Sequence, residues 1–566
     1  MGNFVSSSTY RKCLVKVPRS VGGIVVMRYL KESIIIALVP TIAIAKGKTN
    51  RVGNDKRPNV LIVINDDQSY QHTGYAGCKY VNTPGFDRVA GNGLFFTHCY
   101  AGSPGSAPSR STLVTGRHHW QNKQAGQHAS SWMKDVIPVV DFMDAAGYAT
   151  GYTGKGVDPF LYAQSEKDSM WRESNAAGKP YNNILYTKGK NDERTALGIS
   201  NINYFENFKA FIEQKDSLHP FFFWVGMKEP HRSYEKDSWK RNNKTLEIVN
   251  VPPFLPDNNI VRGDLLDYIV EIEWADRHLV KILNYLDSIG ELDKTLIIVT
   301  ADNGMPFPAA KANCFEAGIH VPMAISYPPL IKRGRRVDDM IGFVDIVPTI
   351  LELTGVNIGN MPQLCGKSLM KIFKSEIDGK VEKNRRWVFA GRERHSSSRW
   401  NNLGYPQRAI VGERYLFIWN MKHNRWPAGA PQTIDVKTGK LNPMFGIDEQ
   451  GRHHSDWAFT DVDASPTKSF ILEHKDEKEV KPYYELAFCK RPVFELYDLI
   501  DDPNCKKNLA FMDDYKKIRK IMYKNLLKEL KESKDSRVVG PNKEIFDEYR
   551  RYLGQERFFP QHEEDQ

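Results

Sequence analysis

The sequence predicts an α/β fold built on a largely parallel sheet, because several of its segments are apolar along their whole length. Residues 59–65 (NVLIVIN), 221–226 (FFFWVG) and 295–301 (TLIIVTA) are runs of large side chains without polar alternation. Such runs are typical of strands that are buried on both faces. Residues 264–289 carry apolar side chains at helical spacing just before the third run, which is the helix-then-strand order of α/β proteins. A shorter helix is expected over residues 141–147.

A charged segment at about residues 373–386 predicts a boundary between two parts of the chain. We expect a large domain with the catalytic site over residues 57–375 and a smaller α+β subdomain over residues 386–566. The second part contains short β-like segments, such as 387–390 and 415–419, and a basic amphipathic helix over about 514–533.

The composition is that of a globular protein whose surface favours anions. Hydrophobic residues are 41% and charged residues 26%, which excludes a fibrous, disordered or multi-spanning membrane protein. Lys and Arg exceed Asp and Glu by 11, so the expected partners are polyanions such as nucleic acid, anionic lipid or acidic polysaccharide. No nucleic-acid-binding motif is present. The seven cysteines form no zinc pattern, and Cys489 and Cys505 are candidates for a disulfide.

Residues 27–45 predict that the protein is exported. They begin Met-Arg-Tyr-Leu-Lys, continue through an apolar stretch and end in Ala-Ile-Ala before Lys46. A basic start, an apolar stretch of about 12 residues and an A-x-A site make up a secretory signal peptide, and this stretch is too short to span a bilayer. We therefore expect a mature chain without a transmembrane segment, in the periplasm or secreted. Residues 1–26 are interpreted as an upstream extension or as the result of a misplaced start, so residues 1–45 are left out of the fold prediction.

Oxygen-rich residues follow two of the buried strands. Asp66 and Asp67 come directly after residues 59–65, and Asp302 and Asn303 come directly after residues 295–301. Ligands of open α/β sheets bind beyond the carboxyl ends of the strands, so the two pairs are expected to converge. Three carboxylates and an amide oxygen suit Ca²⁺ or Mg²⁺ rather than zinc. Either pair by itself is far more typical of a polar turn after a strand, and only their combination favours a metal site.

Residues 106–117 read SAPSRSTLVTGR. This Ser-x-Pro-x-Arg motif followed by Thr-Gly-Arg resembles the signature of the type I sulfatases of the alkaline phosphatase superfamily. In that family a Cys or Ser is oxidised after translation to formylglycine (3-oxoalanine), and this chain resembles the serine type. The resemblance extends from Arg57 to about Ala510. It implies an alkaline-phosphatase-like sandwich with a large, mostly parallel central sheet flanked by helices, plus a smaller C-terminal subdomain with an antiparallel sheet.

The resemblance also implies roles for individual residues. The ligands of one Ca²⁺ ion match Asp66, Asp67, Ser106, Asp302 and Asn303. Ser106 matches the formylglycine position, and Arg110 matches the arginine that stabilises it. Lys155 and Lys311 match sulfate-binding lysines. His231 matches a histidine that contacts sulfate or donates a proton.

Two positions depart from the pattern of the family. The family usually has a histidine two residues after the first lysine, where this chain has Val157, so one sulfate contact or proton donor is missing or replaced. His320 stands where the family has an arginine, and a structural role is expected for it. Residues 229–232 (EPHR) and 302–308 (DNGMPFP) are most similar to heparan N-sulfatases, the sulfamidases.

In the mechanism that the resemblance implies, a hydroxyl of the hydrated aldehyde at position 106 attacks sulfur. Ca²⁺, Lys155 and Lys311 neutralise the oxyanion charge, and His231 protonates the leaving group. The second hydroxyl then expels sulfate and regenerates the aldehyde. An unmodified serine cannot perform this last step, so the resemblance also implies a serine-type sulfatase-maturating enzyme as a partner.

Residues 391–400 (GRERHSSSRW) mix cations and an aromatic side chain, as a glycan cleft does. The predicted substrate-binding residues are Arg394, His395, Arg399 and Trp400, and a structural hairpin with a charged surface is the alternative.

The leading hypothesis is an exported sulfatase that acts on a sulfated polysaccharide or its oligosaccharides, either an algal glycan such as ulvan or a heparin or heparan-type glycan. A sulfamidase acting on N-sulfate is included in it. The alternatives are a phosphodiesterase or phosphatase of the same fold, and a non-catalytic glycan-binding homologue. Zinc-binding relatives of the first kind have a histidine where this chain has Asn303, which argues against that alternative.

Overall fold

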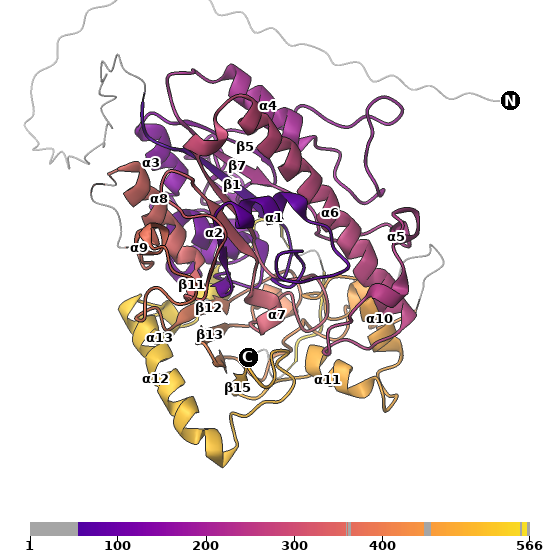
Figure 1. Cartoon of the computed structure of the whole chain (residues 1–566). Coiled ribbons are helices and arrows are strands. Elements are labelled where there is room, and N and C mark those ends of the chain that lie inside the picture. The colour runs from indigo at the N-terminus through magenta and orange to yellow at the C-terminus, as the bar shows by residue number, and fades with distance from the viewer. Residues whose placement is uncertain (1–54, 358, 360–363, 447–453, 555–556, 563–566) are drawn as a thin grey trace, which may run out of the picture. The chain divides into compact units, whose positions relative to one another are not determined.

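The structure is a computed structural model that describes residues 55–357, 359, 364–446, 454–554 and 557–562 (Figure 1). The predicted signal peptide and the upstream extension lie outside the described residues. Within them, no helix combines the length and the apolar character that crossing a bilayer requires.

The main sheet has seven strands, and its centre is parallel. The strand order is β10 (Arg335–Val337), β2 (Leu94–Phe96), β9 (Met323–Ser326), β8 (Thr295–Ala301), β1 (Asn59–Asn65), β7 (Phe221–Gly226) and β5 (Ala149–Gly154). β8, β1, β7 and β5 run parallel, whereas β9 is antiparallel to both of its neighbours. The three predicted strands are β1, β7 and β8, and their bounds are the predicted ones.

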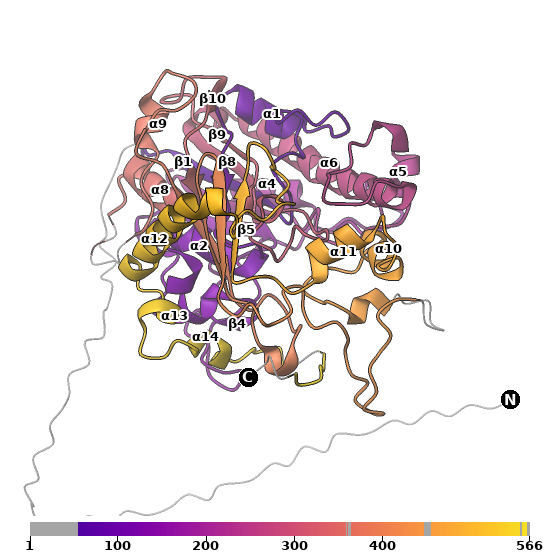
Figure 2. The ribbon, with the colours of Figure 1, turned by 90° about the horizontal axis from the view of Figure 1, so that it is seen from below.

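Helices cover both faces of this sheet, which explains why its central strands show no polar alternation (Figures 1 and 2). Val60, Ile62 and Ile64 of β1 face one apolar cluster, and Leu61 and Val63 face another. The first cluster is completed by α2 (Ser106–Thr115), α3 (Val139–Ala145) and α8 (Ile346–Thr354). The second is completed by α1 (Pro84–Gly91), α4 (Tyr204–Gln214) and α6 (Asn259–Ser288). The predicted α/β fold class is confirmed.

The long helix α6 begins earlier than predicted because of its cap. The side chain of Asn258 accepts hydrogen bonds from the backbone N–H groups of Ile260 and Val261, which satisfies two of the free donors at the helix start. The apolar spacing used for the prediction begins only at the next turn.

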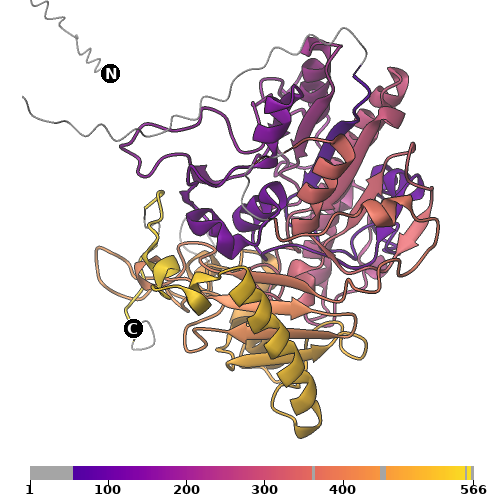
Figure 3. The same ribbon diagram turned by 90° about the vertical axis from the view of Figure 1, so that its left-hand side faces the viewer.

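A four-stranded antiparallel sheet forms from the C-terminal part of the chain. Its order is β12 (Val388–Arg392), β13 (Gln407–Val411), β14 (Tyr415–Asn420) and β15 (Phe494–Asp498). Helix α12 (Lys516–Glu532) lies along one face of these strands (Figure 3). Met522, Leu526 and Leu530 of α12 pack there against Ile410 and Phe417. The predicted antiparallel sheet and the predicted amphipathic helix are therefore present.

Shorter elements complete the fold. The two-residue strands pair as β3 (Cys99–Tyr100) with β11 (Ile341–Gly342) and β4 (Ser130–Ser131) with β6 (Phe160–Leu161). The short helices are α5 (Ser238–Arg241), α7 (Glu316–Ile319), α9 (Met370–Lys374), α10 (Pro466–Glu473), α11 (Lys481–Phe488), α13 (Ser536–Val539) and α14 (Ile545–Glu548). Single turns of 3₁₀ helix lie at His119–Gln121, Lys123–Gly126, Leu246–Ile248, Leu292–Lys294, Phe343–Asp345, Trp400–Asn402, His454–Trp457 and Asp513–Tyr515.

The charged segment before β12 packs against the first part of the chain. Asp339 accepts hydrogen bonds from the backbone N–H groups of Val381 and Glu382. The buried Arg385 forms ion pairs with Asp345 and Glu382.

The disulfide suggested for Cys489 and Cys505 is wrong, since both are free thiols. Cys505 is a member of the apolar cluster beneath the antiparallel sheet, and Cys489 follows the end of α11. Burial raises the pKa of the Cys505 thiol well above its ordinary value, which keeps the thiol neutral.

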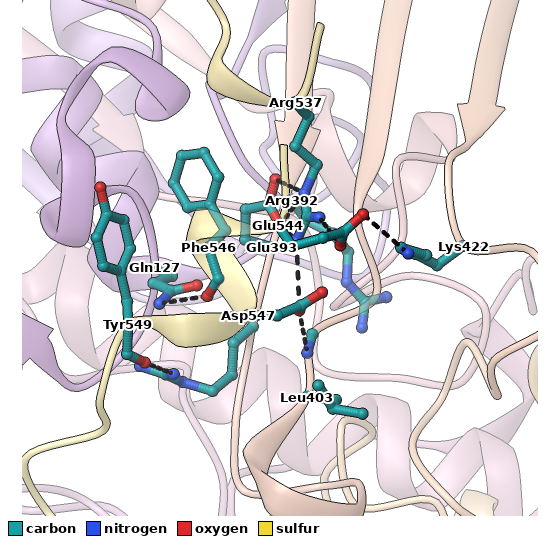
Figure 4. Close-up of polar contacts among 12 residues, drawn as sticks. Gln127, Arg392, Glu393, Leu403, Lys422, Arg537, Glu544, Phe546, Asp547 and Tyr549 are labelled. Atoms are coloured by element: carbon teal, nitrogen blue, oxygen red, sulfur yellow. Dashed lines mark hydrogen bonds and ion pairs between the residues drawn. The ribbon is translucent and has the colours of Figure 1, made fainter. Parts of the chain in front are cut away.

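Buried ion pairs hold the C-terminal segment against the antiparallel sheet (Figure 4). Glu393, which follows β12, is buried and accepts hydrogen bonds from Arg408 and Arg537. Arg408 also donates to Asp535, and Arg537 pairs with Asp547 of α14. Glu393 and Arg537 are 144 residues apart and Arg408 and Asp535 are 127 apart, so the network joins distant parts of the chain.

Arg408→Leu tests this network. The change leaves Asp535 buried without its cation, so we expect the free energy of unfolding to fall by about 3–5 kcal/mol. Urea unfolding followed by circular dichroism measures it. Arg88→Leu is the matched control, because Arg88 pairs with Asp287, whose side chain is 63% exposed, and it should leave stability unchanged. Equal stability of the two variants would contradict a supporting role for the network.

Candidate active site

Four parallel strands end at the same edge of the main sheet, and each is followed by a residue of the site. Asp66 follows β1, Lys155 follows β5, His231 follows β7 and Asp302 follows β8. Because β1 and β8 are neighbours in register, with Asn65 opposite Ala301, the residues that follow them must meet. The predicted convergence is therefore present.

Three buried carboxylates lie together at this edge. Oxygen atoms of Asp66, Asp67 and Asp302 lie within 4.8 Å of one another. The backbone N–H of Asp67 donates to Asp302 Oδ1 at 3.0 Å, and Asn303 Nδ2 donates to Asp67 Oδ1 at 2.7 Å. The second bond turns the Asn303 carbonyl oxygen toward Ser106.

Ser106 is the first residue of α2, a helix whose ten residues are all buried. Its Oγ donates to Asp66 Oδ1 at 2.7 Å and lies 3.3 Å from Asn303 Oδ1. The N-terminal end of a helix carries a partial positive charge, so this position favours an anion beside residue 106. Gly105 is required before it, because a Cβ there would lie 2.6 Å from Nδ1 of His395.

Each carboxylate of the cluster has a cation. Lys155 Nζ lies 2.5 Å from Asp66 Oδ2, and Arg110 Nε lies 2.7 Å from Asp302 Oδ2. Lys311 Nζ lies 2.7 Å from Asp67 Oδ2. The structure therefore brings every residue of the predicted catalytic and metal sets to this edge of the sheet, with His231 beside them.

The electrostatics of the cluster fit a divalent cation. Burial by itself would raise the pKa of Asp66, but the charges of Lys155 and Arg110 lower it well below its ordinary value. Burial and the charge of Asp66 raise the pKa of Asp302 to about 6. Carboxylates whose oxygen atoms lie within 4.8 Å of one another repel. A hard divalent cation bound by these oxygens would relieve the repulsion. Asp66, Asp67, Asp302 and Asn303 could hold such an ion.

A pocket of about 390 Å³ opens beside this cluster. Its walls include Asp66, Lys155, His231 and the loop that contains Gly198 and Ser200. His231 is 37% exposed, and its Nε2 lies 3.8 Å from Asp67 Oδ2.

The orientation of His231 follows from its other ring nitrogen. Nδ1 lies 2.5 Å from the carbonyl oxygen of Arg232, and since a carbonyl only accepts, Nδ1 carries the hydrogen. Arg232 is itself held by a bidentate pair with Asp264 of α6. Nε2 is thereby directed toward the cluster.

Asp463 belongs to the site, and the sequence analysis missed it. Its Oδ2 accepts a hydrogen bond from Lys311 at 2.8 Å, and it lies within 4.8 Å of Asp67 and His231. Burial opposes its ionisation, but Lys311 lowers the pKa of Asp463 strongly. It sits in a loop before α10 that no motif links to the other site residues, so no local signal identified it.

The predicted substrate-binding residues have divergent surroundings. Arg394 and Arg399 are buried and donate to partners inside the chain, namely the carbonyl oxygen of Tyr549 and the carboxylate of Asp461. These contacts are structural. Trp400, the last residue of the segment 391–400, is half-buried at the start of a 3₁₀ turn. His395 lies against Gly105, and burial lowers its pKa to about 4, so it is neutral at pH 7.

The two departures from the family pattern have clear local environments. Val157 is fully buried in an apolar cluster, so its position offers no polar group to the site. His320 stacks on Tyr70 at 4.1 Å and forms a hydrogen bond with the carbonyl oxygen of Thr97. These contacts give His320 the structural role that was expected.

A serine at a helix N-terminus, a cluster of oxygen ligands and three facing cations define a site for an anionic ester at the edge of an α/β sheet. The Sulfatase family model matches residues 58–356. The chain belongs to the sulfatase family, as its motifs predicted. A second model, N-sulphoglucosamine sulphohydrolase, C-terminal, matches residues 310–422 and agrees with the resemblance to sulfamidases.

Relatives of known name support this assignment. An ulvan-active sulfatase of Formosa agariphila is 25% identical over 85% of this chain and 81% of its own length. The human N-sulphoglucosamine sulphohydrolase is 24% identical over 86% of this chain and 92% of its own length. A solved structure of a protein in complex with its substrate D-glucosamine-2-N,6-O-disulfate has a TM-score of 0.57 at 19% identity, covering 85% of this chain and 98% of that one. This last match shows the shared fold.

The carboxylate cluster predicts that a divalent cation stabilises the folded protein. At a calcium concentration about 100 times the dissociation constant, we expect the melting temperature to rise by roughly 2–3 °C. Asp67→Asn should abolish the shift. Asp87→Asn, which changes a carboxyl in α1 outside the cluster, should keep the shift. Differential scanning calorimetry with and without a chelator measures both, and a full shift in Asp67→Asn would refute the site.

Proposed function

We propose that the protein is an exported, calcium-dependent sulfatase that removes sulfate groups from a sulfated polysaccharide or its oligosaccharides. The observation that carries the proposal is the position of Ser106, whose Oγ lies 2.7 Å from Asp66 inside the carboxylate cluster, with Lys155 on the same carboxylate. The sulfatase motif around Ser106 supports its oxidation to formylglycine by a serine-type maturating enzyme. Residues 27–45 support export.

The substrate class rests on charge and on the relatives. The sequence carries a surplus of 11 basic side chains, which favours a polyanion. The relatives include an ulvan-active sulfatase and an N-sulphoglucosamine sulphohydrolase, so algal and heparin-type glycans are the substrates proposed. Both O-sulfate and N-sulfate remain within the proposal.

The cations of the site would bind and orient the sulfate. Lys155 contacts Asp66, which also accepts the hydrogen bond of Ser106, and Lys311 contacts the adjacent Asp67. Arg110 donates to Asp302 and to the carbonyl oxygens of residues 155 and 156, which fixes the loop that carries Lys155. A bound Ca²⁺ ion, held by Asp66, Asp67, Asp302, Asn303 and residue 106, would supply Lewis acidity toward the sulfate oxygens.

The reaction would proceed in two displacements at residue 106. One hydroxyl of the hydrated aldehyde attacks sulfur, and the bond from sulfur to the leaving oxygen or nitrogen breaks as Nε2 of His231 donates a proton to it. The remaining hydroxyl then loses its proton, the bond from carbon to the sulfate oxygen breaks, and the aldehyde is restored with release of sulfate. The directed Nε2 of His231 supports its assignment as the proton donor.

Ser106→Ala tests the nucleophile. We expect sulfate release from heparin-type or ulvan oligosaccharides by protein co-expressed with a serine-type maturating enzyme, and none from the variant. Mass spectrometry should find the peptide with residue 106 lighter by two hydrogen atoms in the active protein. Ser111→Ala, in the same helix with its hydroxyl bonded to the Pro108 carbonyl, should keep activity. Oxidised protein that releases no sulfate from any of these glycans would refute the substrate class.

His231→Gln tests the proton donor. We expect the turnover number on a saccharide sulfate to fall by about 10²- to 10⁴-fold, because the alkoxide or amide leaving group needs a proton. The loss should be much smaller on 4-nitrophenyl sulfate, whose phenolate leaves without one. An equal loss on both substrates would show that His231 binds sulfate and does not donate the proton.

A further inference from the structure

Helix α6 carries four buried carboxyl groups, and three of them have clear structural partners. Asp264 pairs with Arg232. Asp267 accepts hydrogen bonds from Ser238 Oγ and two backbone N–H groups at the start of α5. Asp276 accepts from two backbone N–H groups at the start of α1. The fourth, Glu271, differs from them.

Glu271 is 2% exposed, and its Oε1 has no hydrogen-bond partner within the described residues. A buried carboxyl oxygen without a partner is costly, so natural structures seldom keep one without a use. Glu271 is also part of the wall of the pocket that contains Asp66, Lys155 and His231. The side chain of Glu271 therefore borders the cavity beside the nucleophile.

The second glutamate of this pocket, Glu229, is fully paired, unlike Glu271. Glu229 Oε1 accepts from the backbone N–H of Ser200, and its Oε2 accepts from the hydroxyl of Tyr204. Glu229 thus holds the loop that forms one wall of the pocket. Gly198 in this loop faces Glu271, since a Cβ at position 198 would lie 3.2 Å from Oε1. Gly198 thus packs against this oxygen without donating a hydrogen bond to it.

Burial and the neighbouring carboxyls of Glu229 and Asp267 raise the pKa of Glu271 well above its ordinary value. A neutral carboxyl needs no counterion in the pocket, and its carbonyl oxygen still accepts a hydrogen bond. The pocket thus has a cation, Lys155, beside residue 106 and an acceptor on the wall formed by α6.

We infer, on the basis of the proposed function, that Glu271 is a specificity residue that accepts a hydrogen bond from a hydroxyl or ammonium group of the sugar whose sulfate is removed. A substrate donor at this point satisfies the acceptor that the protein leaves unpaired.

The test compares Glu271→Leu, Glu271→Gln and the control Glu273→Gln with the unaltered protein. Glu273 lies on the same helix and pairs with Lys244 outside the pocket. The substrate is the heparin-type or ulvan oligosaccharide that the unaltered protein hydrolyses best. Thermal unfolding and the mass of the residue 106 peptide confirm that all variants are folded and equally oxidised.

We expect Glu271→Leu to lower kcat/KM on the oligosaccharide by about 10- to 100-fold. Inhibition of Glu271→Leu by inorganic sulfate, which binds without a sugar, should equal that of the unaltered protein. Glu273→Gln should have an unchanged kcat/KM. Glu271→Gln separates the two donors. Its amide oxygen serves a hydroxyl, but it cannot ionise, whereas the positive charge of an ammonium group would lower the pKa of Glu271 and turn it into a carboxylate. Near-normal kcat/KM in Glu271→Gln would identify a hydroxyl, and a loss equal to that of Glu271→Leu would identify an ammonium group.

Two results would overturn the inference. Unchanged kcat/KM in Glu271→Leu would show that the carboxyl does not touch the sugar, and a parallel weakening of sulfate inhibition would show a structural effect on the whole site. Failure of the proposed function is distinguishable from both, because the unaltered protein would then release no sulfate at all.

Discussion

The active-site end of the molecule depends on the balance between three buried carboxylates and three buried or half-buried cations. Bringing Asp66, Asp67 and Asp302 out of water costs several kcal/mol for each charge unless it is compensated. Arg110, Lys155 and Lys311 supply that compensation from three different segments of the chain. The parallel pairing of β1 with β8 makes the arrangement unavoidable, because residues that follow adjacent strands in register must meet.

The C-terminal part of the chain contributes to the same site from the other side. Asp463 reaches Lys311, and His395 reaches the backbone before Ser106. Both loops are held by buried ion pairs, since Arg392 and Arg399 share Asp461 and the neighbouring Glu393 joins Arg408 and Arg537. The antiparallel sheet therefore serves as a support that fixes loops against the first part of the chain.

The pocket beside residue 106 has a wall residue that favours anions and another that favours hydrogen-bond donors. Lys155 favours an anion, whereas Glu271 of α6, elsewhere in the pocket wall, offers a carboxyl group. Such a division orients a molecule that is anionic at one end and rich in hydrogen-bond donors at the other, which describes a sulfated sugar. The sulfatase family and the geometry of the pocket thus agree on the kind of substrate.

The sequence by itself determined the central strands, the carboxylate pairs behind them and the family. Each of these is a local pattern: burial on both faces removes polar alternation from β1, β7 and β8, and the motif at residues 106–117 is continuous. Tertiary structure alone decided the places of Asp463 and Glu271 and the internal roles of Arg394 and Arg399. Whether a charged side chain pairs inside the chain or faces a ligand depends on partners far away in the sequence, such as Asp461 for Arg399. The spacing of residues along the chain does not determine those long-range contacts. Only the folded structure therefore shows which buried charged groups are paired within the chain and which are available to a ligand.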